Sequence, residues 1–587
     1  MMIFRTFICA ALLLSALSFT PSRVARSQPP RRADGETLWV EETLKSLSLR
    51  ERLGQMLMTP VQVEQATGAR LEELKQEVTG LGLGGVVVRG GSPETVAALT
   101  NELQRAVRVP LFVGADYERG LRMQMKSAGT PFTNNMGVAA AGDPRAAFEQ
   151  GKFTAQEARA IGVNWLFGPV ADLNNNPDNP VINVRSFGED PRRVAEFVAA
   201  AVRGTREGGA LSTVKHFPGH GDTAVDSHIG LPTINADRAR LDHMELVPFR
   251  AAVAAGVDSV MTAHIALPKL TGDELPATLS PKVTTDLLRR ELKFDGLVVT
   301  DSLGMGAITK GFPNGEASVR AILAGADVAL TPPELKASLD ALEEAVRSGR
   351  LTQARVDESV RRILRAKYGL GLAVRRTVDP AALKKLVEQR EALESARRVA
   401  EASITLLRDG KGLLPLDARR AATAAFVVVA ADEDPEEGRS FVPQVQARAP
   451  GARVLRADPK TSASTYDALL SEATQADTVI VAAFVKRAAG KGTVALPERQ
   501  AEFVRRLVAS GKPVAVVAFS GPYLVRQFPD ATAFMVAYGI EDVAQEAAAR
   551  VLFGDVPARG RLPVTVPGLF AAGAGIQTKA KNEPRGR

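Results

Sequence analysis

The chain has 587 residues, of which 45% are hydrophobic and 24% are charged. This balance is ordinary for a globular protein, and the length suffices for two or three domains. The net charge of +8 is small for this length, and no basic block alternates with aromatic residues, so the composition argues against a nucleic-acid-binding protein. The single cysteine is Cys9. It lies in a segment that we expect to be removed, which excludes disulfides and cysteine chemistry from the mature chain.

The segment from Met1 to about Arg32 has the pattern of an export signal. Arg5 gives a positive start, Ile8–Leu17 an apolar core, and Ala16–Ser18 a small-residue cleavage site. The apolar run is short for a membrane span, and no later segment has about 18 uninterrupted apolar residues. An uncleaved anchor is the alternative interpretation. We therefore expect an exported, periplasmic or extracellular protein with no membrane attachment in its mature form.

Residues 38–375 alternate short apolar runs with amphipathic helical stretches. The expected strands are Gln55–Thr59, Gly85–Arg89, Leu111–Ala115, Asn164–Pro169, Ser212–Lys215, Ser259–Ala263, Gly296–Thr300 and Asp327–Leu330. Helices such as Pro144–Ile161, Arg192–Gly208 and Val283–Leu292 lie between them. Repeated strand–helix units over this length predict an α/β fold of the (β/α)8 TIM-barrel type, with a doubly wound open sheet as the alternative.

A second domain is predicted over residues 401–570, after a linker over 376–400 that belongs to one long charged helix, Asp379–Ala402. The expected strands of this domain are Ala424–Ala430, Ala452–Arg456, Thr478–Ala483, Val514–Phe519 and Ala533–Ala537. They are short, apolar and mostly separated by helices, which predicts an α/β/α sandwich around a mainly parallel sheet. Residues 571–587 are rich in Gly, Ala, Lys and Arg and are expected to form a disordered tail.

All five histidines fall between residues 216 and 264, and three of them lie in the segment Lys215–His228. This segment follows an expected strand, and polar groups just past the carboxyl ends of barrel strands line the active site. Proline and glycine residues within it rule out a regular helix, so its histidines are not a helical metal-binding pair.

Polar groups also follow the other expected strands. They are Asp116 and Glu118 after the third strand, Asp172 and Arg185 after the fourth, His264 after the sixth and Asp301 after the seventh. One such residue alone is best explained as a capping group or a core ion pair. Carboxylates, cations and histidines at the same end of five strands predict an active site instead.

Several stretches carry a family resemblance. They are Gly168–Asp172 (GPVAD), Val184–Pro191 (VRSFGEDP), Lys215–His228 with its Asp-Ser-His ending, Phe294–Met305 (FDGLVVTDSLGM), Ser403–Leu416 (SITLLRDGKGLLPL) and Leu552–Pro567 (LFGDVPARGRLPVTVP). With these motifs, the chain from about Leu38 to Gly568 resembles the family 3 glycoside hydrolases, specifically the β-N-acetylglucosaminidase branch that includes muropeptide-recycling enzymes. One departure matters. This branch often reads Gln-Glu-Gly-Gly-Arg after the aspartate matching Asp116, whereas Tyr117–Arg122 reads YERGLR, so we expect an arginine contact to the sugar to be shifted or missing.

The resemblance implies a retaining exo-β-N-acetylglucosaminidase that acts on cell-wall muropeptides or related glycans. Asp301 takes the place of the nucleophile, and Asp226 with His228 takes that of the acid/base pair. Physical chemistry agrees, because an imidazole titrates near neutral pH and a carboxylate can hold its tautomer. The residues in sugar-binding positions are Asp116, Arg185, Lys215 and His216. No cofactor or metal is implied, the expected partner is the carbohydrate substrate, and the pattern indicates no particular oligomeric state.

Other functions remain open at this stage. A β-glucosidase of the family generally takes its acid from the second domain, and the histidine pair argues against it. A phosphorylase variant also uses histidine, so phosphate as the acceptor stays possible. A metal-dependent hydrolase has candidate ligands in His216, His220, Asp222, Asp226 and His228. A non-catalytic glycan-binding protein would tend to lack one of the catalytic residues. The segment Gly490–Thr493 lacks the spacing of a phosphate-binding loop and is expected to be a surface loop.

Overall fold

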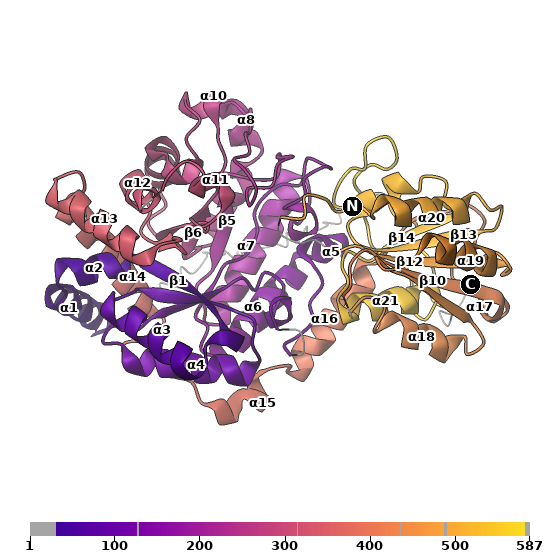
Figure 1. Ribbon diagram of the computed structural model, residues 1–587, viewed down its shortest axis with the longest axis horizontal. Coiled ribbons are helices and arrows are strands. Elements are labelled where there is room, and N and C mark those ends of the chain that lie inside the picture. Colours follow the sequence, from indigo (N-terminus) through magenta and orange to yellow (C-terminus); the bar gives the residue numbers. More distant parts are fainter. Residues whose placement is uncertain (1–30, 126–127, 314, 435, 487–489, 582–587) are drawn as a thin grey trace, which may run out of the picture.

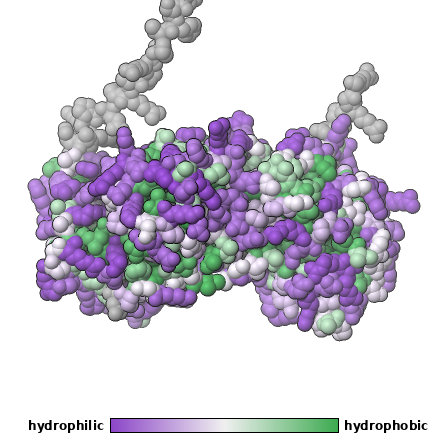
Figure 2. Space-filling model, turned by 90° about the horizontal axis from the view of Figure 1, so that it is seen from above, coloured by the Kyte–Doolittle hydropathy of each residue, from purple (hydrophilic) through white to green (hydrophobic). Residues whose placement is uncertain are grey.

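The computed structural model describes residues 31–125, 128–313, 315–434, 436–486 and 490–581, which form two domains (Figure 1). In space-filling view the molecule has two lobes with an indentation between them, and polar residues dominate the visible face (Figure 2). Within these residues no helix is long and apolar enough to cross a membrane. The expected export signal lies almost entirely outside the described residues.

The first domain is built on eight parallel strands in its described part. They are β1 (Leu57–Gln62), β2 (Gly85–Arg89), β3 (Phe112–Ala115), β4 (Trp165–Leu166), β5 (Thr213–Phe217), β6 (Ser259–Thr262), β7 (Leu297–Thr300) and β8 (Ala329–Leu330). The strands pair as two arcs, β4-β3-β2-β1-β8 and β5-β6-β7. Parallel bridges between Trp165 and Leu211 and between Val299 and Val328 join the arcs. The sheet therefore curls into the predicted barrel.

Helices surround this ring. The main ones are α3 (Gly68–Gly80), α4 (Pro93–Ala106), α6 (Pro144–Ala160), α7 (Pro191–Glu207), α9 (Leu246–Ala254), the π-helix η5 (Lys282–Glu291), α12 (Glu316–Ala324), α13 (Leu335–Arg347) and α14 (Gln353–Gly369), with α1 (Arg31–Ser46) and α2 (Leu49–Gln55) before β1. Their starts are readable in the sequence. Asp143 and Asp190 accept backbone amides at the starts of α6 and α7, and each is followed by proline, which suits the first helical position.

The interior of the barrel is filled by aromatic side chains. Trp165 is fully buried, and its indole Nε1 donates to the hydroxyls of Thr213 (2.8 Å) and Ser259 (2.9 Å). Its ring meets Phe112 and Phe167 edge-on at centroid distances of 4.8 and 5.6 Å. The barrel interior around Trp165 is therefore a packed core rather than a pore.

The second domain is a six-stranded sheet between helices. Its strands are β9 (Thr405–Asp409), β10 (Ala424–Ala430), β11 (Arg453–Ala457), β12 (Thr478–Phe484), β13 (Val514–Phe519) and β14 (Ala533–Val536), in the order β11-β10-β12-β13-β14-β9. All pair in parallel except β9, which runs antiparallel to β14. The sequence motifs did not mark β9 as a strand.

Alternation along the central strands explains the two layers of helices. On β10, Phe426 and Val428 face one apolar cluster and Val427 and Val429 face the other, as expected for a strand buried on both faces. The first cluster is covered by α16 (Arg390–Ser403), α18 (Phe441–Arg448) and α21 (Asp542–Leu552), and the second by α19 (Ala463–Ala473) and α20 (Glu498–Val508). This is the predicted α/β/α sandwich.

The linker differs from the single helix expected over Asp379–Ala402. It consists of a short 3-10 turn η6 (Pro380–Ala382), α15 (Leu383–Leu386) and α16. The break falls at Glu388, whose φ of 56° is left-handed and whose amide donates to the Glu157 carboxylate at 2.9 Å. The buried Glu157 carboxylate requires hydrogen-bond donors, and the Glu388 amide supplies one. This tertiary contact overrides the local preference for helix.

The expected tail also differs, because residues 571–581 lie against the second domain. The Ile576 amide donates to the Leu406 carbonyl at 2.7 Å, and the Thr578 amide donates to the Ala558 carbonyl at 3.2 Å. Leu406 belongs to β9, an edge strand with unpaired backbone groups. Covering that edge gives these residues hydrogen bonds that composition alone does not predict. Residues 582–587 lie outside the described part.

Candidate active site

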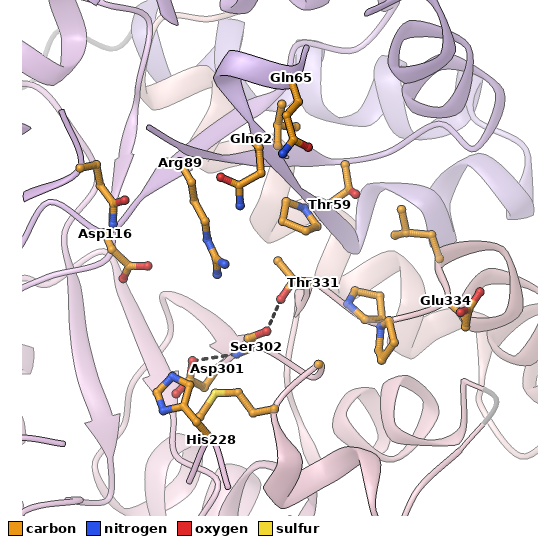
Figure 3. Close-up of a pocket in the computed structure, with 18 of the residues that line it drawn as sticks. Thr59, Gln62, Gln65, Arg89, Asp116, His228, Asp301, Ser302, Thr331 and Glu334 are labelled. Carbon is orange, nitrogen blue, oxygen red and sulfur yellow. Dashed lines mark hydrogen bonds between the residues drawn. The ribbon is translucent and has the colours of Figure 1, made fainter. Parts of the chain in front are cut away.

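A cavity of about 1200 Å³ opens at the carboxyl ends of the barrel strands (Figure 3). The predicted site residues that line it are Asp116, Arg185, Lys215, His216, His228 and Asp301. Asp226 lies behind His228 and holds it. The structure therefore brings together side chains that the sequence spreads over about a third of the chain.

Asp301 follows β7 and is rigidly held. Its backbone amide donates to the Thr262 carbonyl at 3.1 Å, and the Ser302 amide donates to its Oδ1 at 2.7 Å (Figure 3). Burial raises the pKa of Asp301, but the rings of His216 and His264 and the Ser302 amide outweigh it and lower the pKa to about 2. The carboxylate is therefore ionised at working pH and available as a nucleophile.

Asp226 and His228 form a close pair in the loop that follows β5. His228 Nδ1 lies 2.7 Å from Asp226 Oδ1, and the His228 backbone amide donates to the same oxygen at 2.9 Å. Burial raises the pKa of Asp226, but these hydrogen bonds and one from Gly490 lower it. An ionised Asp226 fixes the proton on Nδ1, so Nε2 is the nitrogen left to exchange a proton with substrate. The His228 side chain is 38% exposed.

The second domain contributes directly to this pair. The amide of Gly490 donates to Asp226 Oδ2 at 2.9 Å, and the neighbouring Lys491 pairs with Asp432 at 2.7 Å. Gly490–Thr493 is a surface loop, as expected, and it also contacts the site. The sequence gives no signal for the contact, because it joins residues 264 positions apart.

Lys215 anchors a buried charge network beside Asp301. Its Nζ lies 2.7 Å from Asp116 Oδ1 and 2.8 Å from Glu118 Oε1. Arg185 donates two hydrogen bonds to the carboxylate of Glu118, from Nη2 (2.6 Å) and Nε (3.0 Å). Burial lowers the pKa of Lys215, but Asp116 and Glu118 raise it above the ordinary value; conversely, Arg185 and Lys215 hold the pKa of Glu118 well below its usual range despite burial. These ion-paired groups suit oriented hydrogen bonds to sugar hydroxyls.

His216 is oriented by a buried carboxylate. Its Nδ1 lies 2.7 Å from Asp172 Oδ2, and its backbone amide donates to Asp172 Oδ1. Its Nε2 lies 3.4 Å from Arg185 Nη2 and borders the cavity. The sequence places Asp172 and Glu118 after strands, and the structure makes them the supports of His216, Lys215 and Arg185.

The remaining histidines of the motif have partners of their own. His220 lies between the hydroxyls of Thr223 and Ser227, each at 3.0 Å, and burial lowers its pKa to about 4, so it is neutral. Asp222 pairs with Arg240 at 2.6 Å. Within the described residues, no group of three His, Cys, Asp or Glu is arranged to hold a metal ion.

The arginines that follow Asp116 in the sequence do not reach the cavity centre. Arg119 pairs with Glu541 at 2.8 Å, and Arg122 pairs with Asp542 at 2.6 Å, both across the domain interface. An arginine from a different strand reaches the cavity instead. Arg89, the last residue of β2, points into the cavity (Figure 3). Its place at the end of a predicted strand was the signal that sequence reasoning missed.

Comparison with known proteins identifies the family. The models of the N-terminal and C-terminal domains of glycosyl hydrolase family 3 match residues 48–366 and 404–582. The chain belongs to glycosyl hydrolase family 3. It is 30% identical over 555 residues to a "Beta-N-acetylglucosaminidase/beta-glucosidase" of Cellulomonas fimi, covering 90% of this chain and 96% of that one.

Two solved structures are similar to the chain over most of their length. One is a family 3 β-N-acetylglucosaminidase from Paenibacillus sp. str. FPU-7, at 34% identity and a TM-score of 0.80, covering 89% of this chain and 99% of that one. The other is the β-glucoside phosphorylase BglX, at 29% identity and a TM-score of 0.82, covering 91% and 97%. This family 3 chain therefore has neighbours with both hydrolase and phosphorylase names.

Proposed function

We propose that this family 3 glycosidase is a retaining exo-β-N-acetylglucosaminidase, which releases terminal β-linked N-acetylglucosamine from muropeptides or related glycans. The observation that carries the proposal is the Asp226–His228 pair on the same cavity as the ionised Asp301. A nucleophilic carboxylate and a separate proton donor are what retaining cleavage requires. Relatives with β-N-acetylglucosaminidase names support the substrate class.

In the proposed reaction Asp301 attacks the anomeric carbon while His228 Nε2 protonates the leaving oxygen. Asp226 stabilises the imidazolium through Nδ1. His228, now neutral, then removes a proton from water, which attacks the anomeric carbon and releases Asp301. Asp116, Arg185, Lys215 and His216 hold the sugar through its hydroxyls and its N-acetyl group, with their own charges fixed by Glu118 and Asp172.

A phosphorylase is the second candidate. The similarity to BglX favours it, and so does the nature of the base, because a neutral imidazole does not repel phosphate as a carboxylate would. In that reaction phosphate attacks the same glycosyl-enzyme in place of water. Release of a sugar 1-phosphate, rather than the free sugar, distinguishes the two.

The decisive experiment compares hydrolysis of an aryl β-N-acetylglucosaminide and the matching aryl β-glucoside, each with and without inorganic phosphate. We expect the N-acetylglucosaminide to be preferred by a wide margin. Equal or faster turnover of the glucoside would contradict the substrate assignment and favour a β-glucosidase. Product analysis by mass spectrometry separates free sugar from sugar phosphate.

We also propose that the protein is exported and loses roughly its first 18 to 32 residues, because the apolar core after Arg5 is followed by small residues. Mass spectrometry of the mature protein from its host measures the new N-terminus. An intact Met1 on protein recovered from the cytoplasm would refute this proposal.

A further inference from the structure

The lysine and arginine side chains that line the cavity differ in one respect. Four of the five are paired with carboxylates: Arg70 with Glu73, Arg185 with Glu118, Lys215 with Asp116 and Glu118, and Lys336 with Asp340. The guanidinium of Arg89 is the exception, since no ion pair or hydrogen bond joins it to any residue in the described part of the chain. The cavity therefore offers one guanidinium whose donors are unused.

The position of Arg89 is fixed by the barrel. It ends β2, whose preceding residues Val86–Val88 are buried, and it is the register partner of Gln62 on β1. Figure 3 shows its guanidinium directed into the space between Asp116 and Ser302, with the Gln62 amide beside it. The side chain thus extends from a rigid strand end into the same space that Asp301 and His228 face.

The carboxylate that follows β1 is occupied elsewhere. Glu64 Oε1 accepts the Gly91 amide at 2.6 Å. This contact needs the turn at Gly90 and Gly91, whose φ values of 73° and 85° are left-handed. A Cβ at Gly90 would come within 2.5 Å of the Glu64 carboxylate. The turn therefore binds Glu64 through backbone and leaves Arg89 without an internal counter-ion.

A neutral sugar does not require this cation, because Asp116, Lys215, Arg185 and His216 already surround its hydroxyls. A guanidinium with free donors instead matches a planar or tetrahedral oxyanion, which it can bind through two parallel hydrogen bonds. We propose that Arg89 is the anion-recognition residue of this cavity and binds a carboxylate or phosphate group of the reacting partner. The inference rests on the proposed glycosidase function and names the charge that its substrate or acceptor carries.

Two sources supply such a group. One is a carboxylate on the leaving group, such as the lactyl carboxylate of a muramic acid residue. The other is inorganic phosphate as the acceptor: its oxygen forms a bond to the anomeric carbon while the bond to Asp301 Oδ breaks, which gives a β-configured sugar 1-phosphate and the free carboxylate. Both place one oxyanion within reach of Arg89.

The first arm of the test uses two disaccharides that differ in charge and by one methyl group, N-acetylglucosaminyl-β-1,4-N-acetylmuramic acid and its lactyl methyl ester. Arg89→Gln should lower kcat/KM for the acid by about tenfold or more relative to the ester, the effect of one charge-assisted contact. Arg89→Lys should lose part of this preference, because lysine keeps the positive charge but cannot form the two parallel hydrogen bonds of a guanidinium. Arg70→Gln, at a paired arginine of the same cavity, is the matched control and should leave the ratio within about twofold.

The second arm titrates inorganic phosphate against the wild type and Arg89→Gln, by calorimetry and by the rate of sugar 1-phosphate release. A phosphate affinity at least about tenfold weaker in the variant identifies phosphate as the ligand, whereas a loss confined to the acid disaccharide identifies the substrate carboxylate. Equal effects on acid and ester with unchanged phosphate binding would overturn the inference. Failure of the wild type to cleave any N-acetylglucosaminide contradicts the proposed function instead, and the calorimetric arm still tests Arg89.

Discussion

The two ends of the barrel each bury a lysine, and the pKa values of the two lysines shift in opposite directions. At the carboxyl end, Lys215 is held by Asp116 and Glu118, and its pKa is raised despite burial. At the amino end, Lys367 of α14 is fully buried, and burial lowers its pKa well below the ordinary value. Its Nζ donates to the Gln55 side-chain oxygen at 2.7 Å and lies 5.0 Å from the Phe112 ring centre. No carboxylate pairs with it in the described part of the chain.

The amino end also holds a fully paired charge cluster. Asp327 is completely buried, and Arg289, Arg355 and Arg362 surround it at ion-pair distance. Here, however, the charges satisfy one another and the 1200 Å³ cavity lies at the opposite end. Burial and pairing alone therefore do not mark function. The carboxyl end is distinguished because its paired charges line this cavity together with Asp301 and His228.

The largest expected effect is at Asp301, the residue most tied to the carboxyl end. Asp301→Ala should lower kcat by roughly 10⁴-fold or more on every substrate, because no covalent intermediate forms. Steady-state kinetics on an aryl N-acetylglucosaminide measure it. Asp222→Ala, which removes a nearby carboxylate that pairs with Arg240 outside the cavity lining, is the control and should keep most of the activity. Wild-type-like turnover by Asp301→Ala would refute the role of Asp301 as the nucleophile.

His228→Ala should lower the rate by about 10²- to 10⁴-fold for poor leaving groups and much less for acidic aryl leaving groups in the first step. Added azide should restore turnover and give the β-azide, since azide needs no general base. Asp226→Ala should show a milder form of the same pattern, because the imidazole remains but is poorly oriented. If poor and good leaving groups were affected equally and azide had no effect, His228 would be a binding residue and another acid would be required.

A substitution at the amino end of the barrel should change stability but not activity, unlike the substitutions at the carboxyl end. Asp327→Ala leaves Arg289 buried without its counter-ion and should lower the free energy of unfolding by about 3–5 kcal/mol, while kcat/KM of the folded protein stays within about twofold. Denaturant unfolding measures the loss. Asp295→Ala is the matched control, since Asp295 pairs with Arg362 but is 87% exposed, and should cost less than about 1 kcal/mol. A large loss of kcat/KM in folded Asp327→Ala would contradict a purely structural role for the charge cluster at the amino end.

The smallest effect concerns Lys367 and appears as a pH dependence. The pKa of Lys367 is lowered in the folded protein, so the unfolded chain binds more protons between that pKa and the ordinary lysine value. The free energy of unfolding should therefore rise with pH across this window, by up to about 1.4 kcal/mol per unit from this group. Lys367→Met should lack this contribution, whereas Lys384→Met on the short helix α15 should retain it. Unfolding curves at pH 7, 8 and 9 test this, and identical slopes in wild type and Lys367→Met would contradict it.

Much of the fold was predictable where a strand is a continuous apolar run between turns. The observed β2, β10 and β13 have the predicted bounds, because the interior positions of a strand buried on both faces need apolar residues. Strand β9 and the break at Glu388 were not predicted. Each depends on a distant partner, β14 for the strand and Glu157 for the break, and local sequence carries no record of that partner.

Strand periodicity and the Lys215–His228 motif were enough to predict which residues stand at the carboxyl ends of the strands, among them Asp301, because both are local features of the chain. The partners of these residues depend on how the chain folds. Closure of the barrel places Glu118 between Lys215 and Arg185. Docking of the second domain brings the Gly490 amide to Asp226. The Gly91 amide binds Glu64, so this carboxylate does not pair with Arg89. Charge state and availability for a ligand follow from these partners, since burial penalises an unpaired charge and a pair relieves the penalty.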